Sequence, residues 1–167
     1  ETDPLHKVSI IPRGAHALGY TMQLPIEDRY TMSKKELLAR MTVMMGGRVA
    51  EQLVFNEITT GAQDDLETAT ETGRRMVCEF GMSDRLGNLT YGKRERQMFL
   101  GRDLFEERNY SEQTAVLIAE EIRRLVDAAH ERARQTLTAH RDKLDLLATT
   151  LLEKEVLDGE DVKRLIG

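Results

Sequence analysis

Cysteine, aromatic residues and long apolar runs are all scarce in this sequence. One cysteine, Cys78, excludes an intramolecular disulfide framework and a zinc site built from several thiolates. Tryptophan is absent and aromatic residues make up only 5% of the chain, so a core must be built mainly from Leu, Ile, Val, Met and Ala. No apolar run approaches the roughly 18 residues that cross a bilayer as a helix.

An excess of basic charge is also missing. The 24 Lys and Arg residues face 29 Asp and Glu residues, which gives a net charge of −5 and argues against a nucleic-acid partner. With 40% apolar and 32% charged residues, the 167-residue chain has the composition of one globular domain. It opens on Glu1-Thr2-Asp3-Pro4, without an initiator Met, so we expect a piece of a longer protein.

Extended structure is predicted mainly near the N-terminus. Residues 6–12 and 18–24 are rich in β-branched or alternating residues and are joined by a short connection that contains glycine. They predict a hairpin, with a bulge at Gly19. A further extended segment is predicted over residues 86–91.

Apolar residues at helical spacing dominate the rest of the chain. Ser33 and Glu36 predict a capping box, and Ser111 and Asp158 are predicted caps of later helices. Gly46-Gly47 lies inside the first helix, where a close approach of another backbone would explain its cost. Helices are predicted over residues 33–54, 61–81, 111–140, 143–155 and 158–166.

These patterns together predict a mainly α fold, a helical bundle with a small N-terminal β element. Residues 1–167 form a single domain in this interpretation. It comprises a β-rich edge (1–30), core helices (33–80), a loop (93–109) and C-terminal helices (111–167). The methionines at helical spacing are expected in the core.

Familiar catalytic motifs are absent from the sequence. His130-Glu131 begins a zinc-peptidase pattern, but Arg134 occupies the place of the second histidine, and a guanidinium does not bind zinc. There is no P-loop and no GxGxxG sequence. The residues alone therefore predict a solvated helix face at His130, and a core position for Cys78.

Acidic residues gather at the predicted start of the second helix. Asp64, Asp65 and Glu67 follow Thr60-Gly61-Ala62. Carboxylates are favoured at the positive end of the helix dipole, and the residues by themselves favour this ordinary role. The alternative, that one carboxylate turns inward to bind a cation, stays open at this point.

Several segments, in register from end to end, resemble one known family. These are residues 3–14 (DPLHKVSIIPRG), 17–21 (ALGYT), 46–51 (GGRVAE), 60–66 (TGAQDDL), 75–77 (RMV) and 110–115 (YSEQTA). They resemble the protease domain of the FtsH family of membrane-anchored, ATP-dependent zinc metalloproteases. The resemblance implies a mainly helical protease domain that assembles as a homo-hexamer beneath an AAA+ ATPase ring.

The resemblance implies a zinc ligand at Asp65. The family holds Zn²⁺ with this aspartate and two histidines of an HExxH helix, and Asp64 stands where the family usually has Asn. HExxH lies upstream in the family and is absent here, so no catalytic residue is expected within the chain, and neither His6 nor His16 replaces the missing ligands. Because catalytic zinc sites use three protein ligands, the chain alone is expected to be inactive. Glu51 is expected to be a hydrogen-bond or salt-bridge partner rather than a ligand.

The resemblance also implies a strand that pairs with the substrate. We assign it to Leu18, Gly19, Tyr20 and Thr21, because a glycine permits close backbone approach. The alternative, an ordinary hairpin strand with Tyr20 packed on the core, is equally compatible with the sequence.

The implied function is hydrolysis of unfolded or membrane proteins by a zinc metalloendopeptidase. ATP and Mg²⁺ would bind only to the AAA+ ATPase domain of the same chain. The implied location is the cytoplasmic face of the bacterial inner membrane or an organellar membrane, with a role in membrane protein quality control. The alternative is a non-catalytic helical module for oligomerisation or partner binding.

Overall fold

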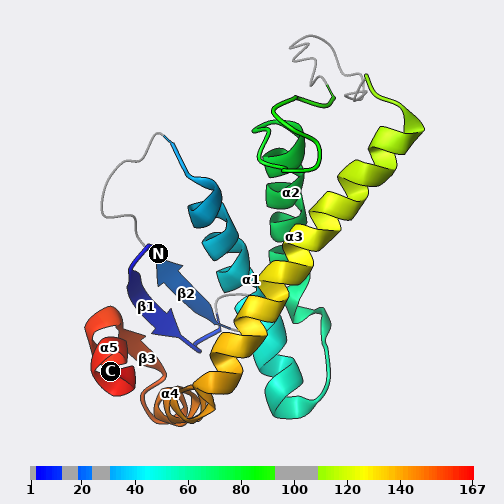
Figure 1. The fold of residues 1–167 in the computed structure, drawn as a ribbon. Helices are drawn as coiled ribbons and strands as arrows, with labels where there is room; N and C mark the ends of the chain where they lie inside the picture. The colour runs from blue at the N-terminus through cyan, green and yellow to red at the C-terminus, as the bar shows by residue number, and fades with distance from the viewer. Residues whose placement is uncertain (1–2, 13–18, 24–30, 93–108) are drawn as a thin grey trace, which may run out of the picture.

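A computed structural model describes residues 3–12, 19–23, 31–92 and 109–167 (Figure 1). Three helices form the body: α1 (Lys34–Phe55), α2 (Gln63–Cys78) and α3 (Glu112–Ala139). The long helix α3 runs diagonally across the other two and packs on both. The mainly α fold with a small β element is therefore confirmed, whereas most of the predicted loop at 93–109 lies outside the described residues.

Polar caps define where the helices begin. Ser33 Oγ accepts a hydrogen bond from the Glu36 amide at 3.2 Å, and Glu36 Oε2 accepts one from the Ser33 amide at 2.8 Å. Ser111 Oγ caps α3 by accepting a hydrogen bond from the Thr114 amide, and Asp158 caps α5 (Gly159–Ile166) by accepting one from the Asp161 amide. Each cap satisfies an end amide that has no partner within its helix. The three predicted helix starts are confirmed.

The sheet joins the two ends of the described chain. Strand β1 (Leu5–Ser9) lies in the middle, with β2 (Tyr20–Gln23) on one side and β3 (Val156–Asp158) on the other, both antiparallel. The hairpin was predicted, but β3 was not. The pairing of β1 with β2 is irregular between Leu5 and Lys7 of β1, and not at Gly19, where the bulge was predicted.

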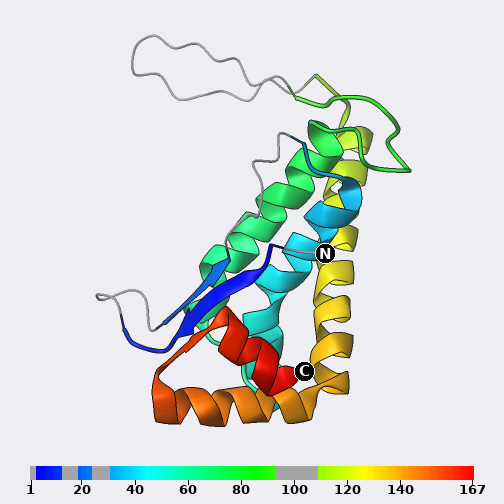
Figure 2. The same ribbon diagram turned by 90° about the vertical axis from the view of Figure 1, so that its left-hand side faces the viewer.

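Two hydrophobic clusters hold these elements. The larger lies between α1, α2 and α3, where Met41, Met45 and Met76 are fully or almost fully buried, which confirms core packing of these methionines. The smaller is built on Leu151, Leu157 and Val162. It fixes α4 (Arg141–Lys154) and α5 to the sheet, and Figure 2 shows α4 running sideways from the lower end of α3.

Two further predictions about local structure are wrong. Residues 86–91 form no strand, because Ser83 Oγ accepts hydrogen bonds from the amides of Arg85 and Leu86, and Gly87 has a φ of 71°. These contacts close a turn. At Gly46 and Gly47, an added Cβ would meet nothing within 4 Å among the described residues, so no close backbone approach explains them.

None of the helices in the described ranges combines the length and the apolar character that a bilayer crossing requires.

Candidate functional site

The acidic segment begins α2, as its composition suggested. A short 3₁₀ turn (Thr60–Ala62) precedes the helix, and Thr59 Oγ1 caps this turn by accepting a hydrogen bond from the Gly61 amide at 3.2 Å. Buried Ala62 anchors the turn. Asp64 and Asp65 consequently lie in the first turn of α2, at the positive end of its dipole.

Asp65 carries a carboxylate that the described residues do not neutralise. The residue is exposed, and no hydrogen bond or ion pair joins it to the part of the chain that the structure describes. Partial desolvation, and secondly the neighbouring charge of Asp64, raise the pKa of Asp65 above its ordinary value. A cation at this position would offset both effects, because it would stabilise the charged form of the carboxylate. Asp64 therefore opposes ionisation of Asp65 in the metal-free chain.

Three residues tie this segment to α1; we call Arg48, Glu51 and Thr59 the Thr59 clamp. Thr59 Oγ1 donates to Glu51 Oε1 at 2.7 Å, and the Thr59 amide lies 3.4 Å from Glu51 Oε2. Arg48 Nη1 donates to the Thr59 carbonyl at 3.0 Å. Glu51 is thus a hydrogen-bond partner, as predicted. The sequence did not single out Thr59 or Arg48, because nothing in the pattern reveals contacts between a helix and the loop that follows it.

The residues predicted to bind substrate lie in a different element. Tyr20 and Thr21 are in β2, an edge strand that pairs with β1 and does not pack closely on α2 within the described residues. A Cβ on Gly19 would lie 2.5 Å from the Ser9 carbonyl oxygen, so this glycine permits close approach of the chain's own β1. Leu18 lies outside the described residues.

No metal site is complete within the described residues. They contain no group of three His, Cys, Asp or Glu side chains that could hold an ion. His130 Nε2 lies 3.0 Å from Gln52 Oε1, and Glu131 pairs with Arg134 at 2.7 Å. The His130-Glu131 segment therefore forms a polar helix face, as predicted. His16 falls outside the described part of the chain.

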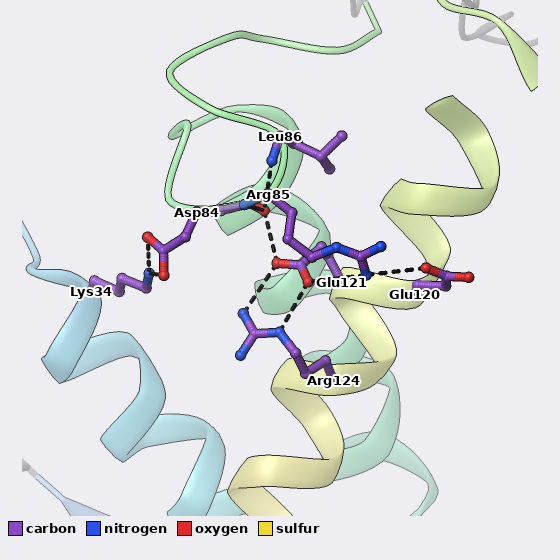
Figure 3. A network of polar contacts seen from close by, with 8 residues as sticks. Lys34, Asp84, Arg85, Leu86, Glu120, Glu121 and Arg124 are labelled. Atoms are coloured by element: carbon purple, nitrogen blue, oxygen red, sulfur yellow. Dashed lines mark hydrogen bonds and ion pairs between the residues drawn. The ribbon is translucent and has the colours of Figure 1, made fainter. Parts of the chain in front are cut away.

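A network of polar contacts surrounds a second acid, Glu121, which differs from Asp65 in being buried and paired with positive charge (Figure 3). The side chain of Glu121 is fully buried, and it accepts hydrogen bonds from Ser83 Oγ at 2.8 Å and Arg124 Nε at 3.0 Å. The hydrogen bond from Arg124 is the main cause that lowers the pKa of Glu121, and the nearby Arg85 acts in the same direction. This neutralised acid fastens the 83–87 turn to α3. It has a structural role, and Asp65 remains the candidate ligand.

The chain is similar to known proteins over almost its whole length. Residues 1–165 match peptidase family M41. The chain is 54% identical over 164 residues, 98% of its length, to the ATP-dependent zinc metalloprotease FtsH of Pseudothermotoga lettingae, and it covers 26% of that protein. It is 52% identical over 167 residues to the FtsH of Bacillus subtilis, covering 99% of this chain and 26% of the relative. The chain thus spans about a quarter of the length of these curated relatives.

Proposed function

Because the chain belongs to peptidase family M41, we propose that it is the proteolytic domain of an ATP-dependent zinc metalloendopeptidase. The match from residue 1 to residue 165 carries this proposal, together with a carboxylate, Asp65, that has no counter-charge among the described residues. The relatives' names supply the zinc, the ATP dependence and the class of reaction.

The donor chemistry of Asp65 fits one position of a zinc site. Zinc accepts carboxylate oxygen, and catalytic sites use three protein ligands and an open position. When bound, zinc polarises the peptide carbonyl and lowers the pKa of a water molecule towards 7. We propose that the two other ligands and the general base belong to an HExxH helix outside these 167 residues, and that the isolated chain is inactive. Within the chain, Asp65 supplies the ligand and the Thr59 clamp holds the segment that carries it.

A matched pair of variants tests the assignment of Asp65. In the full-length protein, Asp65→Asn should abolish zinc retention and proteolysis of an unfolded substrate while leaving ATP hydrolysis intact. Glu67→Gln, which neutralises an exposed acid two residues away, should change none of these properties. Normal zinc content in Asp65→Asn would disprove the assignment. Calorimetric titration of the 167-residue chain should show no sub-micromolar zinc binding.

We further propose that residues 18–21, which run into the start of β2, bind the substrate by strand addition. Among the described residues β2 lies at an edge of the sheet, so one side of it faces away from β1, as this mode of recognition requires. Residues along an antiparallel strand direct their amides alternately to the two sides. Of Thr21→Pro and Met22→Pro, the variant that removes the outward amide should raise KM for an unfolded substrate without unfolding the hairpin. An unchanged KM for both variants would contradict strand addition.

The partners and the location of the full-length protein are proposals of the same kind. The relatives are called ATP-dependent and are about four times as long as the part that this chain covers. We therefore propose an AAA+ ATPase domain in the same polypeptide, a homo-hexameric assembly, and anchoring at the cytoplasmic face of a membrane. Sedimentation of the detergent-solubilised full-length protein should give the mass of six subunits.

A further inference from the structure

We propose that Arg48 and Thr59 are positioning residues for the Asp65 carboxylate, an inference that rests on the proposed zinc-binding function. Neither side chain is placed to bind the metal itself, since one donates to a backbone carbonyl and the other to Glu51. Their role is to fix the path of the chain that enters α2.

The contacts hold Thr59 through all of its polar groups. Its hydroxyl donates to Glu51 Oε1 and accepts from the Gly61 amide, so both hydrogen-bonding functions of the hydroxyl are used. Its carbonyl accepts from Arg48 Nη1, and its amide faces Glu51 Oε2. A residue bound through its amide, carbonyl and side chain has little freedom to shift or rotate.

The support for the clamp is rigid on the side of α1. Arg48 and Glu51 lie three residues apart on α1, and Val49, which lies between them in the sequence, is 0% exposed in the main core. The 3₁₀ turn packs closely against the clamp, since a Cβ added to Gly61 would lie 3.3 Å from Thr59 Oγ1 and 3.7 Å from Glu51 Oε1. Loss of the clamp would therefore disturb the 3₁₀ turn.

Regular structure transmits this constraint to Asp65. From Thr60 the chain passes through the 3₁₀ turn directly into α2, with no irregular residue between the clamp and Asp65. The clamp therefore constrains the backbone position from which the Asp65 carboxylate projects, without contacting the carboxylate itself. Groups that hydrogen-bond a metal ligand directly typically contribute 10–100-fold to metal affinity, and the clamp acts one step further from the metal, through the backbone.

The experiment compares three variants of the full-length protein. Thr59→Val keeps the shape of the side chain but removes the hydroxyl, Thr59→Ser restores the hydroxyl, and Thr149→Val removes an exposed hydroxyl that donates to the Asp145 carbonyl in α4. Zinc affinity is measured by competition with a chelator, and the ligand geometry is followed through the visible absorption of the Co²⁺-substituted protein.

Thr59→Val should lower zinc affinity by up to about 10-fold, the lower end of the range for groups that contact a ligand directly, and alter the Co²⁺ spectrum. Thr59→Ser should restore both, and Thr149→Val should match the wild type. Wild-type affinity and spectrum in Thr59→Val would overturn the proposal, as would failure of Thr59→Ser to restore them. If Thr59→Val does not fold, Arg48→Gln applies the same test through the carbonyl contact alone, and wild-type zinc affinity there counts against the clamp.

The Asp65→Asn variant separates this inference from the proposed function. If Asp65→Asn loses zinc while the clamp variants keep it, the positioning role is wrong and the zinc site stands. If Asp65→Asn keeps zinc, the assigned ligand is wrong.

Discussion

At the scale of single residues, two acids show that exposure alone does not set a pKa. The side chain of Glu121 is fully buried, yet its pKa is lowered, because donated hydrogen bonds and positive charge outweigh desolvation. Asp65 is exposed, yet its pKa is raised, because it is partly desolvated and lies next to Asp64. The direction of the pKa shift of each acid therefore follows from the groups around it.

Replacement of Glu121 should destabilise the protein in a pH-dependent way. Since the carboxylate accepts hydrogen bonds from Ser83 and Arg124, Glu121→Gln should lower the free energy of unfolding by about 1–3 kcal/mol at pH 7. Because the folded-state pKa lies below the ordinary value of 4.5, this stabilisation is fully present above that pH and is lost as the pH falls through the folded-state pKa. Urea unfolding of the 167-residue chain between pH 3 and pH 7 measures it (the pH range spans the ordinary pKa of Glu).

The neighbouring acid provides the control. Glu120 pairs with Arg85 at 3.1 Å, but its side chain is 52% exposed, so Glu120→Gln should change stability by at most about 1 kcal/mol. An equal loss in both variants, or a loss in Glu121→Gln that does not shrink in acid, would contradict the role given to the buried carboxylate.

At the scale of elements, two glycines should respond oppositely to alanine. Gly47 is exposed inside α1, where a Cβ meets nothing within 4 Å of the described residues, so Gly47→Ala should raise the free energy of unfolding by up to about 1 kcal/mol. A Cβ on Gly159 would instead overlap the Leu5 carbonyl oxygen, so Gly159→Ala should weaken the contact between α5 and β1. Thermal unfolding of both variants measures the two changes in stability. A stabilisation by both substitutions, or a destabilisation by both, would contradict this description of the space around the two glycines.

The sequence predicts those elements whose signals are local. The caps at Ser33, Ser111 and Asp158 each lie within three residues of the amide they bind, so their motifs are visible in the sequence. β3 was missed, because three residues have too little periodicity and the strand forms only against β1, far away in the chain. Residues 86–91 were misassigned, because the Ser83 hydroxyl competes successfully for backbone amides.

In the candidate site, too, local features were predictable from the sequence and contacts between separate segments were not. The acids of the first turn of α2 were predicted from composition, but family resemblance was needed to choose Asp65. The clamp partners Arg48 and Thr59 lie eleven residues apart and meet only when α1 and the following loop fold together. A helical or strand pattern in the sequence does not show how the loop after a helix folds back against it, so this contact could not be predicted.

At the scale of the whole molecule, the two hydrophobic clusters should differ in stability. The large cluster spans three long helices, whereas the small one rests on Leu151, Leu157 and Val162 with a few partly buried neighbours. Hydrogen exchange in the 167-residue chain should therefore be faster in β1, β3 and α5 than in the cores of α1 and α3. Leu157→Ala, at a cost of about 2–5 kcal/mol to the small cluster, should widen this difference. Uniform protection across both clusters would contradict the division.

The central position of β1 has a consequence for the order in which the fold is completed. Val8 of β1 is paired with Leu157 of β3. During translation β1 therefore cannot complete its pairing until almost 150 further residues have been synthesised. A nascent chain can close the β1–β2 hairpin and pack the three long helices, but until residues 156–158 emerge, one side of β1 stays bare, with amides and carbonyls ready to pair with another chain. Translation thus leaves the sheet as the last part to close.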